Sequence, residues 1–593
     1  MHTCLKTNDF ELKLSCRWCI VIGIKNRTNV CRLRKRDGAC PEKTGWAARR
    51  RWTARECRKG SMRNKIGKRW IDIVPWLLLA AAYAVTVGHF ALYGMHNLDA
   101  DMSSEMLFAD LLNREGRLLT DSWYYSSELR TVSPVPLYQL GLLLFDSWHS
   151  ARVFGTALML AGILASFLYF SREAGLGRAG VYMAVVLAMP FSDVYAYVAF
   201  LNGGYSVYLM LVFVLLGLVL GMEKARHRGI RLLLTGILSL WGGTGGVRMM
   251  LFWAVPISAA CTLEAFEALR QNKRMAQAWQ QPLRITLIAA ALSAGLTAAG
   301  YLINARVLSG LYDYVRYDQT GLSMPQSSLF FAQLTGIAEF FGYRASSRML
   351  SSRGVASLLA LCMMGLSLYA VSRLLARSRA GRLCRTQRIL LYFTISSLAL
   401  GITVNALTEN YFARYYLPGI LMLVLLLFVC WEGTVCLCAP LRRAVPLALC
   451  AVFALEAGIY LRQEKTTQTA PYEDAADWLL SNGYTRGFAT FWNGAPLTEA
   501  SDGAITVYTM PDSYWQDDYK HLTLNCFLQE KANIEAVESG KVEGPVFVLL
   551  TAQECLQDVP YADEAHLAAQ LDAGNVYIYE SVSALYAAAA GEE

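Results

Sequence analysis

The sequence predicts a polytopic α-helical membrane protein with a small α/β domain at its C-terminal end. Of the 593 residues, 55% are hydrophobic, and the mean hydropathy is +0.31. Apolar stretches of bilayer-spanning length recur along most of the chain. Charge divides unevenly, with 20 Lys and Arg against 5 Asp and Glu in residues 1–69, and 6 against 21 in residues 462–593. We therefore expect the two ends to lie on opposite sides of the membrane.

Residues 1–69 are expected to form a basic, disordered leader on the cytoplasmic side. A basic start is ordinary in a membrane protein, so we expect no nucleic-acid partner. Six of the 15 cysteines lie in this region, and Cys16-Arg17-Trp18-Cys19 has the spacing of half a zinc knuckle. Because residues 1–61 show no apolar periodicity, disorder or an over-extended start is the preferred interpretation, and the zinc site is the alternative.

The first span is expected from Trp70 to about Tyr93, and the basic residues before it place its far end outside. An outer loop, 95–133, follows. It opens with Leu98-Asp99-Ala100-Asp101-Met102-Ser103-Ser104-Glu105, which sets three carboxylates just beyond a span, where charge is costly unless it is used or paired. Residues 103–115 have helical apolar spacing and predict an amphipathic surface helix, capped by Ser103 or Ser104.

Charge parity then assigns the remaining spans of the transmembrane domain, 70–461. The apolar run 136–145 is too short to cross and is expected to be re-entrant or interfacial. All later basic clusters fall inside if the spans are at about 153–170, 180–198, 205–221, 229–242, 248–264, 284–303, 355–373, 388–406, 413–432 and 443–461. The total is about 11 spans, with the N-terminus inside and the C-terminus outside. Outer loop 305–353 is long for a connection, and its amphipathic stretch 329–341 suits a lid or a substrate entrance.

Residues 462–593 are expected to form a soluble, extracytoplasmic α/β domain. A helix is predicted at 471–480, ending near Gly483. Strands are predicted at 487–491, 504–508, 545–550 and 575–579. Cys526 and Cys555 are the two cysteines of this region, and two residues alone do not predict a disulfide.

The candidate site combines outer carboxylates with outer cations. A carboxylate base can deprotonate an incoming hydroxyl, while cations hold a phosphate leaving group. The base candidates are Asp101, which we prefer, and Asp99. Phosphate-binding candidates on the same side are Arg248, Arg414 and Arg130. Substrate positioning is expected from Glu105, Tyr124, Tyr125, Glu128 and Tyr415.

Each of these residues also has an ordinary structural explanation. Aspartates are common in solvated turns. An arginine at a span end often snorkels to the interface, and tyrosines gather there in an aromatic belt. A functional site is favoured because the acidic loop and the arginines are all predicted to lie on the same side of the membrane.

No cofactor is expected to be required, although Asp99-x-Asp101 offers oxygen ligands for a divalent cation, Mg²⁺ or Mn²⁺. No nucleophile elbow, Walker loop, HExxH motif or dinucleotide-binding GxGxxG appears in the sequence. Soluble hydrolase, ATPase and dehydrogenase chemistries therefore have no support.

Several of these segments together resemble the GT-C superfamily of polyprenyl-phosphate-sugar glycosyltransferases, which includes protein O-mannosyltransferases and lipid A aminoarabinose transferases. The likeness covers most of residues 70–461. An acidic motif follows the first span, Pro134-Val135-Pro136-Leu137-Tyr138 is similar to the family's Pro-Pro-Leu-Tyr-like entry, and Arg152 opens the next span. Gly245-Gly246-Val247-Arg248 resembles its glycine-plus-cation turn, and Arg414-Tyr415-Tyr416-Leu417-Pro418 its late Arg-Tyr-x-x-Pro entry.

The resemblance implies a GT-C-like fold in the cell membrane and inverting transfer on the extracytoplasmic face. The donor would be a polyprenyl-phosphate sugar, the acceptor a cell-envelope glycan, lipid or protein, and the base a first-loop aspartate. The mannosyltransferases often have an Asp-Glu pair where this chain has Asp99-Ala100-Asp101, so the choice of base stays open between the two aspartates.

Two other functions remain as alternatives. One is a lipid-linked sugar transporter or flippase, which would place ionisable groups near mid-membrane instead of at the outer span ends. The other is a non-catalytic envelope assembly protein whose acidic C-terminal domain binds a partner.

Overall fold

The computed structural model describes residues 73–201, 203–272, 281–315, 327–408, 413–432, 439–462, 470–511, 522–555 and 559–591. Within these residues, nine helices are long and apolar enough to cross a membrane. They are Ile73–Asn97, Trp148–Ala174, Gly203–Lys224, Met250–Arg270, Leu283–Gly310, Ser352–Arg379, Arg385–Leu407, Ala413–Trp431 and Ala444–Leu461. The protein is thus a multi-pass α-helical membrane protein, as expected. The predicted leader, with its cysteines, lies outside the described residues.

Two shorter helices occupy the remaining two expected span positions: α6 (Gly177–Leu187) and α9 (Arg228–Thr244). The expectation of one continuous span at 180–198 is wrong. Helix α6 ends before Pro190, and the chain restarts as α7 (Asp193–Ala196) and a short π-helix, η2 (Tyr197–Leu201). Proline has no N–H for the helical ladder and restricts the residue before it, which explains the break.

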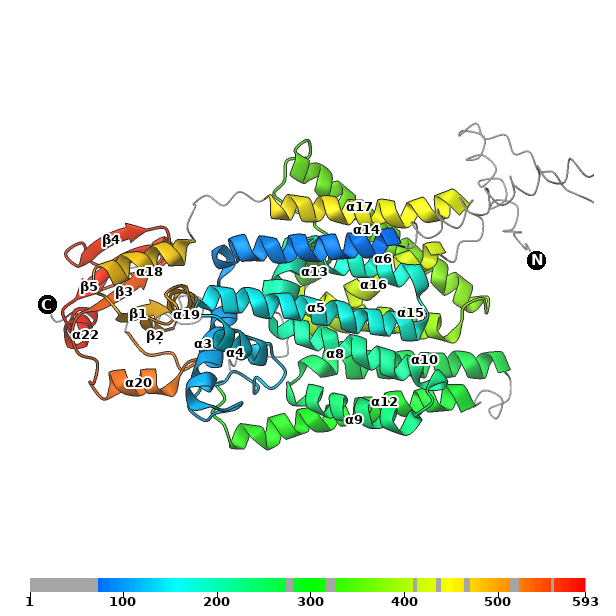
Figure 1. Ribbon diagram of the computed structural model, residues 1–593, viewed down its shortest axis with the longest axis horizontal. Helices are drawn as coiled ribbons and strands as arrows, with labels where there is room; N and C mark the ends of the chain where they lie inside the picture. The colour runs from blue at the N-terminus through cyan, green and yellow to red at the C-terminus, as the bar shows by residue number, and fades with distance from the viewer. Residues whose placement is uncertain are drawn as a thin grey trace, which may run out of the picture. The chain divides into compact units, whose positions relative to one another are not determined.

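The helices run side by side in one bundle (Figure 1). Their bounds are α5 (Trp148–Ala174), α8 (Gly203–Leu220), η4 (Met250–Ala254), α10 (Val255–Asn272), α12 (Gln281–Arg306), α13 (Ser327–Phe340), α14 (Ser352–Arg379), α15 (Arg385–Leu407), α16 (Leu417–Glu432) and α17 (Ala439–Leu461). Helix α13 confirms the helical stretch predicted inside outer loop 305–353. Residues 316–326 of that loop lie outside the described residues.

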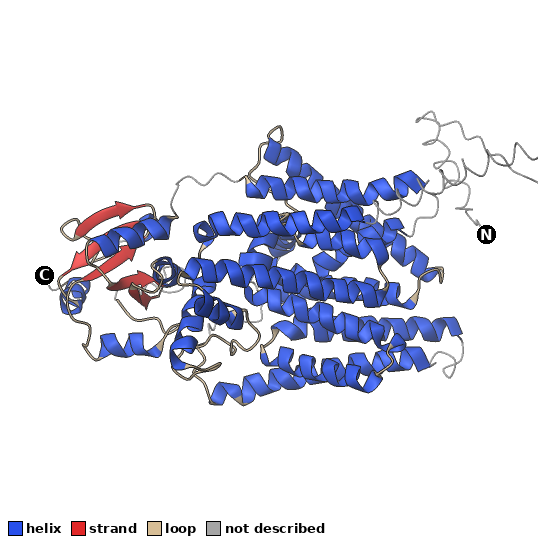
Figure 2. Cartoon of the chain, in the orientation of Figure 1, coloured by secondary structure: helices blue, strands red, loops and turns tan. Residues whose placement is uncertain are grey.

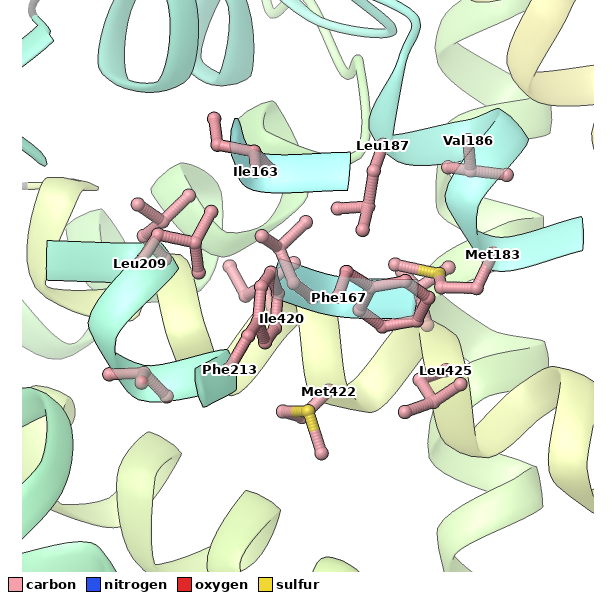
Figure 3. Close-up of a cluster of buried hydrophobic side chains, with 14 of the residues drawn as sticks. Ile163, Phe167, Met183, Val186, Leu187, Leu209, Phe213, Ile420, Met422 and Leu425 are labelled. Atoms are coloured by element: carbon pink, nitrogen blue, oxygen red, sulfur yellow. The ribbon is translucent and has the colours of Figure 1, made fainter. Parts of the chain in front are cut away.

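The centre of the bundle is apolar on all sides. Helix α8 is buried along almost its whole length, which agrees with a sequence that is hydrophobic all round. Figure 3 shows Phe167 of α5, Met183 of α6, Phe213 of α8 and Ile420 of α16 in one cluster. The helix Ile73–Asn97, by contrast, exposes Trp76 and Leu77, and only 22% of its apolar window is buried.

Helices α9 and α12 cross at two glycines. A Cβ on Gly243 would meet the backbone carbonyl of Thr297, and one on Gly300 would come within 2.9 Å of the Gly243 Cα. Small residues let two membrane helices approach until their backbones touch. The glycine-rich end of α9 therefore permits a close helix–helix contact.

The C-terminal part contains a five-stranded sheet in the order β2-β1-β3-β5-β4 (Figure 2). Strands β2 (Thr506–Met510) and β3 (Val546–Leu550) pair in parallel with β1 (Arg486–Thr490). Strand β5 (Gly574–Tyr579) runs antiparallel to β3 and to β4 (Leu567–Leu571). The helices are α18 (Pro471–Ser481), α19 (Phe491–Ala500), α20 (Lys531–Glu538), α21 (Ala552–Cys555) and α22 (Val582–Ala590).

Four of these strands and α18 are where the sequence places them. Strand β4 is not among the predicted strands, because Leu567-Ala568-Ala569-Gln570-Leu571 lacks the β-branched and aromatic residues that signal a strand. Cys526 and Cys555 are both free thiols.

Two helices that follow the first span lie between the bundle and the C-terminal sheet: α3 (Ala100–Glu115) and α4 (Val135–Leu144). Helix α4 is 10 residues long, so the expectation that it is too short to cross is confirmed. Helix α3 is not an exposed surface helix. It packs against α4 on one side and α19 on the other, and most of its residues are buried.

Candidate active site

The acidic motif after the first span forms the start of α3. Asp99 has an extended backbone (φ −138°, ψ 171°), and its side chain accepts a hydrogen bond of 2.9 Å from the Met102 backbone N–H. Asp99 is therefore the N-cap, and the expectation that Ser103 or Ser104 caps this helix is wrong. An aspartate caps a helix as well as a serine does, and it stands earlier in the chain.

The two aspartates have different surroundings. Asp99 also takes a hydrogen bond from the Tyr197 side chain in the π-helix η2. Its burial, helped by the negative charge of Asp101, raises the pKa of Asp99 to about 6. Asp101 is half-buried one residue inside the helix and interacts electrostatically with both Arg248 and Arg414.

Arg248 and Arg414 are brought together on the ring of a buried tyrosine. The Arg248 guanidinium carbon lies 5.0 Å from the centre of the Tyr205 ring, and that of Arg414 lies 5.4 Å from it. Such distances are within the range of cation–π contacts. Tyr205 stands near the start of α8, so two arginines that are 166 residues apart in the sequence meet over one aromatic side chain.

Arg248 is held in place by contacts with the turn that follows α9 and with Glu128. Its guanidinium forms an ion pair with Glu128, which is only 4% exposed. Gly246 has φ +85°, and a Cβ there would collide with the Glu128 carboxylate. Glycine is needed both for this left-handed conformation and for the close approach of Glu128.

A second ion pair lies beside the first. Arg130 donates a hydrogen bond of 2.7 Å to Glu105, and their side chains are 14% and 2% exposed. Burial raises the pKa of Glu105 to about 7, against the opposing effect of Arg130. The predicted positioning residues Glu105 and Glu128 are thus both paired with predicted phosphate-binding arginines.

Arg152 fastens the first turn of α3 to the rest of the protein. Its guanidinium is buried, donates to the Met102 carbonyl at 3.0 Å, and pairs with Glu499 of α19 through a second hydrogen bond of 2.6 Å. It also lies 5.1 Å from the Tyr138 ring. Arg152 therefore positions the backbone immediately after Asp101.

The structure brings most of the predicted site residues together. The gathered set consists of Asp99, Asp101, Glu105, Glu128, Arg130, Arg248, Arg414 and Tyr415, whose ring lies 5.9 Å from the Arg414 guanidinium. Tyr124 and Tyr125 are not part of it. Tyr125 is fully buried and donates to the Thr120 carbonyl at 2.7 Å, while Tyr124 lies 5.4 Å from Lys531.

Sequence reasoning missed Tyr205 and Tyr197. Tyr205 follows Gly203-Gly204 at the entrance of a span, where a tyrosine cannot be told from an ordinary aromatic-belt residue. Tyr197 falls at the end of the expected span 180–198, which the structure breaks at Pro190. The break at Pro190, which turns the chain and brings Tyr197 back to Asp99, was the available signal.

The side chains around Asp99 and Asp101 give no further support to the predicted divalent-cation site. Among the described residues, no group of three or more His, Cys, Asp and Glu is arranged to hold a metal ion. Asp99 and Asp101 alone offer fewer ligands than a typical Mg²⁺ or Ca²⁺ site uses, and the Asp99 carboxylate already accepts hydrogen bonds from the Met102 N–H and the Tyr197 side chain. The divalent cation at Asp99 and Asp101 stays a prediction.

Comparison with solved structures identifies the architecture. ArnT from Cupriavidus metallidurans in the apo state aligns with a TM-score of 0.53 and 12% identity, over 86% of this chain and 99% of that chain. The protein has the ArnT fold. The same ArnT bound to undecaprenyl phosphate also aligns with a TM-score of 0.53, at 13% identity and with the same coverage. This confirms the expected GT-C-like architecture.

The Archaeoglobus fulgidus oligosaccharyltransferase in complex with Zn and sulfate aligns with a TM-score of 0.43 and 14% identity, over 80% of this chain and 68% of that chain. No protein-family model matches the sequence, and no curated protein matches it either. At these identities the likeness to ArnT is one of fold.

Proposed function

We propose that this protein is a glycosyltransferase that moves a sugar from a polyprenyl-phosphate-linked donor to a cell-envelope acceptor on the extracytoplasmic face. One observation carries the proposal: Arg248 and Arg414 converge on Tyr205 where spans begin, and Asp101 lies close enough to interact electrostatically with both arginines. A base and a phosphate-binding pair in one place match the two requirements of such a transfer. The ArnT structure with bound undecaprenyl phosphate supports the same class of donor by likeness of fold.

In the proposed reaction, Asp101 accepts the proton of the acceptor hydroxyl as its oxygen attacks the anomeric carbon. The bond between that carbon and the phosphate oxygen breaks, and the polyprenyl phosphate leaves with the electron pair. Arg248 and Arg414 hold the phosphate and stabilise the charge that develops on it. Attack from the face opposite the phosphate inverts the anomeric configuration.

The positions of the other charged groups suit this role. Glu128 and Glu105 fix Arg248 and Arg130, and Arg152 fixes the α3 backbone beside Asp101. An active site works best when its groups are held in place before the substrate arrives. We propose that the bundle spans the plasma membrane. The charge asymmetry of the chain places the N-terminus in the cytoplasm and the C-terminal sheet outside the cell.

The acidic and basic residues of the cluster gather where spans begin or end, between Asn97 and α3, just before Met250, and in the first turn of Ala413–Trp431. That placement favours a reaction at the membrane surface over the transporter alternative, which needs charges at mid-membrane. No observation specifically favours a non-catalytic envelope assembly protein.

The test is Asp101→Asn in the purified full-length protein. We expect transfer to fall by about 10²- to 10⁴-fold, the usual contribution of a general base. The assay follows release of polyprenyl phosphate from a panel of synthetic polyprenyl-phosphate hexoses and pentoses, with envelope extract as the acceptor. Asp121→Asn, a change to an exposed carboxylate in the same outer loop, serves as the matched control.

Normal activity in both Asp101→Asn and Asp99→Asn would refute the assignment of the base. A thermal unfolding curve for each variant separates a chemical defect from a folding defect. Release of polyprenyl phosphate without any acceptor-linked sugar would instead indicate hydrolysis.

A further inference from the structure

A cavity of about 360 Å³ lies between the second half of α3 and the C-terminal sheet domain. This volume falls within the range of about 300–1,000 Å³ that is usual for small-molecule sites. Leu107, Asp110 and Arg114 of α3 form one wall. They follow Asp101 by 6 to 13 residues, which is about 9–20 Å along the helix axis at 1.5 Å per residue. The cavity is therefore separate from the acidic and basic cluster.

The opposite walls come from the C-terminal part of the chain. Helix α19 contributes Ala495 and Thr498, and strand β2 contributes Thr506. A third wall is built where the two parts of the chain pair by backbone hydrogen bonds. Tyr124 N–H donates to the Gln529 carbonyl at 2.9 Å, and Lys531 N–H donates to the Ser122 carbonyl at 3.0 Å. This pairing places Trp123 and Gln529 in the same wall of the cavity.

Both of these residues carry polar atoms that no group satisfies. Trp123 is 2% exposed and Gln529 is 5% exposed. Within the described part of the chain, Trp123 Nε1, Gln529 Nε2 and Gln529 Oε1 have no hydrogen-bond partner. A buried polar group without a partner costs about 1–3 kcal/mol, so such a group calls for an explanation. A ligand with several hydroxyls would supply both donors and acceptors for them.

The charges that line the cavity disfavour an anion. Arg114 pairs with Asp110 at 2.8 Å and with Glu530 at 2.8 Å, so the one cation among the described residues that line the cavity is already matched by two carboxylates. A phosphate or a second lipid-linked donor would meet net negative charge here. Trp148 and Phe491 add aromatic surface, which suits the apolar face of a sugar ring.

We propose that this cavity binds a neutral sugar residue of the acceptor glycan, at a distance from the hydroxyl that reacts. The proposal rests on the proposed function, since it takes the substrate of the same enzyme as its ligand. It identifies the acceptor as a glycan of more than one sugar. Helix α3 then carries the catalytic base at its first turn and a wall of the acceptor subsite in its later turns.

The experiment measures binding without catalysis. Chitotriose, mannotriose and galactotriose are titrated separately into the full-length protein in detergent, and binding is followed by calorimetry. Two variants alter the cavity. Gln529→Leu removes the unpartnered amide at similar size, so it is not expected to destabilise the fold. Ala495→Phe fills the space from the opposite wall. Asp101→Asn and Asp121→Asn are the matched controls outside the cavity.

We expect at least one of the three glycans to bind saturably, and both cavity variants to weaken it by about tenfold or more. The two controls should bind as the unaltered protein does, and Asp101→Asn should do so while transfer is lost. Binding that is equal in all variants, or absent for all three glycans, would overturn the subsite. Binding that depends on the cavity in a protein that never transfers sugar would overturn the proposed function and keep the cavity as a glycan site.

Discussion

At the scale of single residues, the two aspartates of the first-loop motif, Asp99 and Asp101, have different partners. Asp99 is committed to the Met102 N–H and to Tyr197. Asp101 interacts electrostatically with the two arginines that lie over Tyr205. Asp99 is the N-cap and has an extended backbone, whereas Asp101 lies in the first turn of the helix, so the two side chains have different surroundings. This supports Asp101 as the base and Asp99 as the residue that positions the helix start.

The raised pKa of Asp99 predicts a pH effect on stability. The usual pKa of an aspartate is about 3.9, and burial raises that of Asp99 to about 6. Between these two values the folded state holds more protons at this position than the unfolded state, so the stability contributed by Asp99 falls as the pH rises. Asparagine keeps the N-cap hydrogen bond and has no charge to acquire.

We therefore expect Asp99→Asn to gain about 1–2 kcal/mol relative to the unaltered protein between pH 4 and pH 7. Thermal unfolding in detergent across this range measures the difference, with Asp121→Asn as the exposed control. Parallel stability curves for Asp99→Asn and the unaltered protein would contradict the prediction. If the activity of the unaltered protein falls as the pH drops below about 6, and Asp99→Asn removes this pH dependence, the base would be Asp99 and not Asp101.

At the scale of elements, a close helix crossing precedes the turn that carries Arg248. Gly243 of α9 meets Gly300 of α12, and Gly245 and Gly246 then lead the chain to Arg248. The position of the Arg248 guanidinium thus depends on how closely α9 approaches α12. The sequence shows the glycines, but it does not show which helix they face.

Gly300→Ala should therefore destabilise the bundle. Its Cβ would press on the Leu240 carbonyl and the Gly243 Cα, and overpacking of this kind costs about 1–3 kcal/mol. Gly295→Ala is the matched control on the same helix, because a Cβ there meets nothing within 4 Å. That change should be neutral or stabilise α12 by about 0.5–1 kcal/mol. Equal unfolding temperatures for the two variants would show that the crossing is looser than we infer.

At the scale of the whole molecule, the C-terminal domain is joined to the membrane bundle through buried polar contacts. Arg152 of α5 pairs with Glu499 of α19, and the Trp148 N–H donates to Asp502 at 2.7 Å. Glu499 is fully buried, so this ion pair has no water to replace either partner. Arg152 also donates to the Met102 carbonyl, which links the placement of the C-terminal domain to the proposed base on α3.

Glu499→Ala should cost about 3–5 kcal/mol, because it leaves the Arg152 charge buried without its partner. Joint replacement by Arg152→Met and Glu499→Leu should recover much of that stability, while activity stays low for lack of the hydrogen bond to Met102. Thermal unfolding and limited proteolysis of the C-terminal domain give the stability, and the release assay gives the activity. Full activity in the double variant would rule out a positioning role for Arg152.

Particular residues show how far the sequence reached. It placed Asp99, Asp101, Arg248 and Arg414 on one side by counting charges between spans, and the structure brings them into one cluster. It did not predict that Glu105 and Glu128 would each pair with an arginine. It also placed Tyr125 near substrate, whereas burial against Phe108, with ring centres 5.5 Å apart, makes it part of the core.

Local patterns in the sequence were enough to predict the membrane class, the approximate positions of most spans, and the acidic start of α3. These features depend on local composition and on periodicity along a single helix. Only the tertiary structure decided that Tyr205 lies beneath two arginines, that Glu499 reaches Arg152 across 347 residues, and that a cavity closes over Trp123 and Gln529. Those contacts join segments that are distant in the sequence. Their energies depend on burial and on neighbouring groups, which local sequence patterns do not predict.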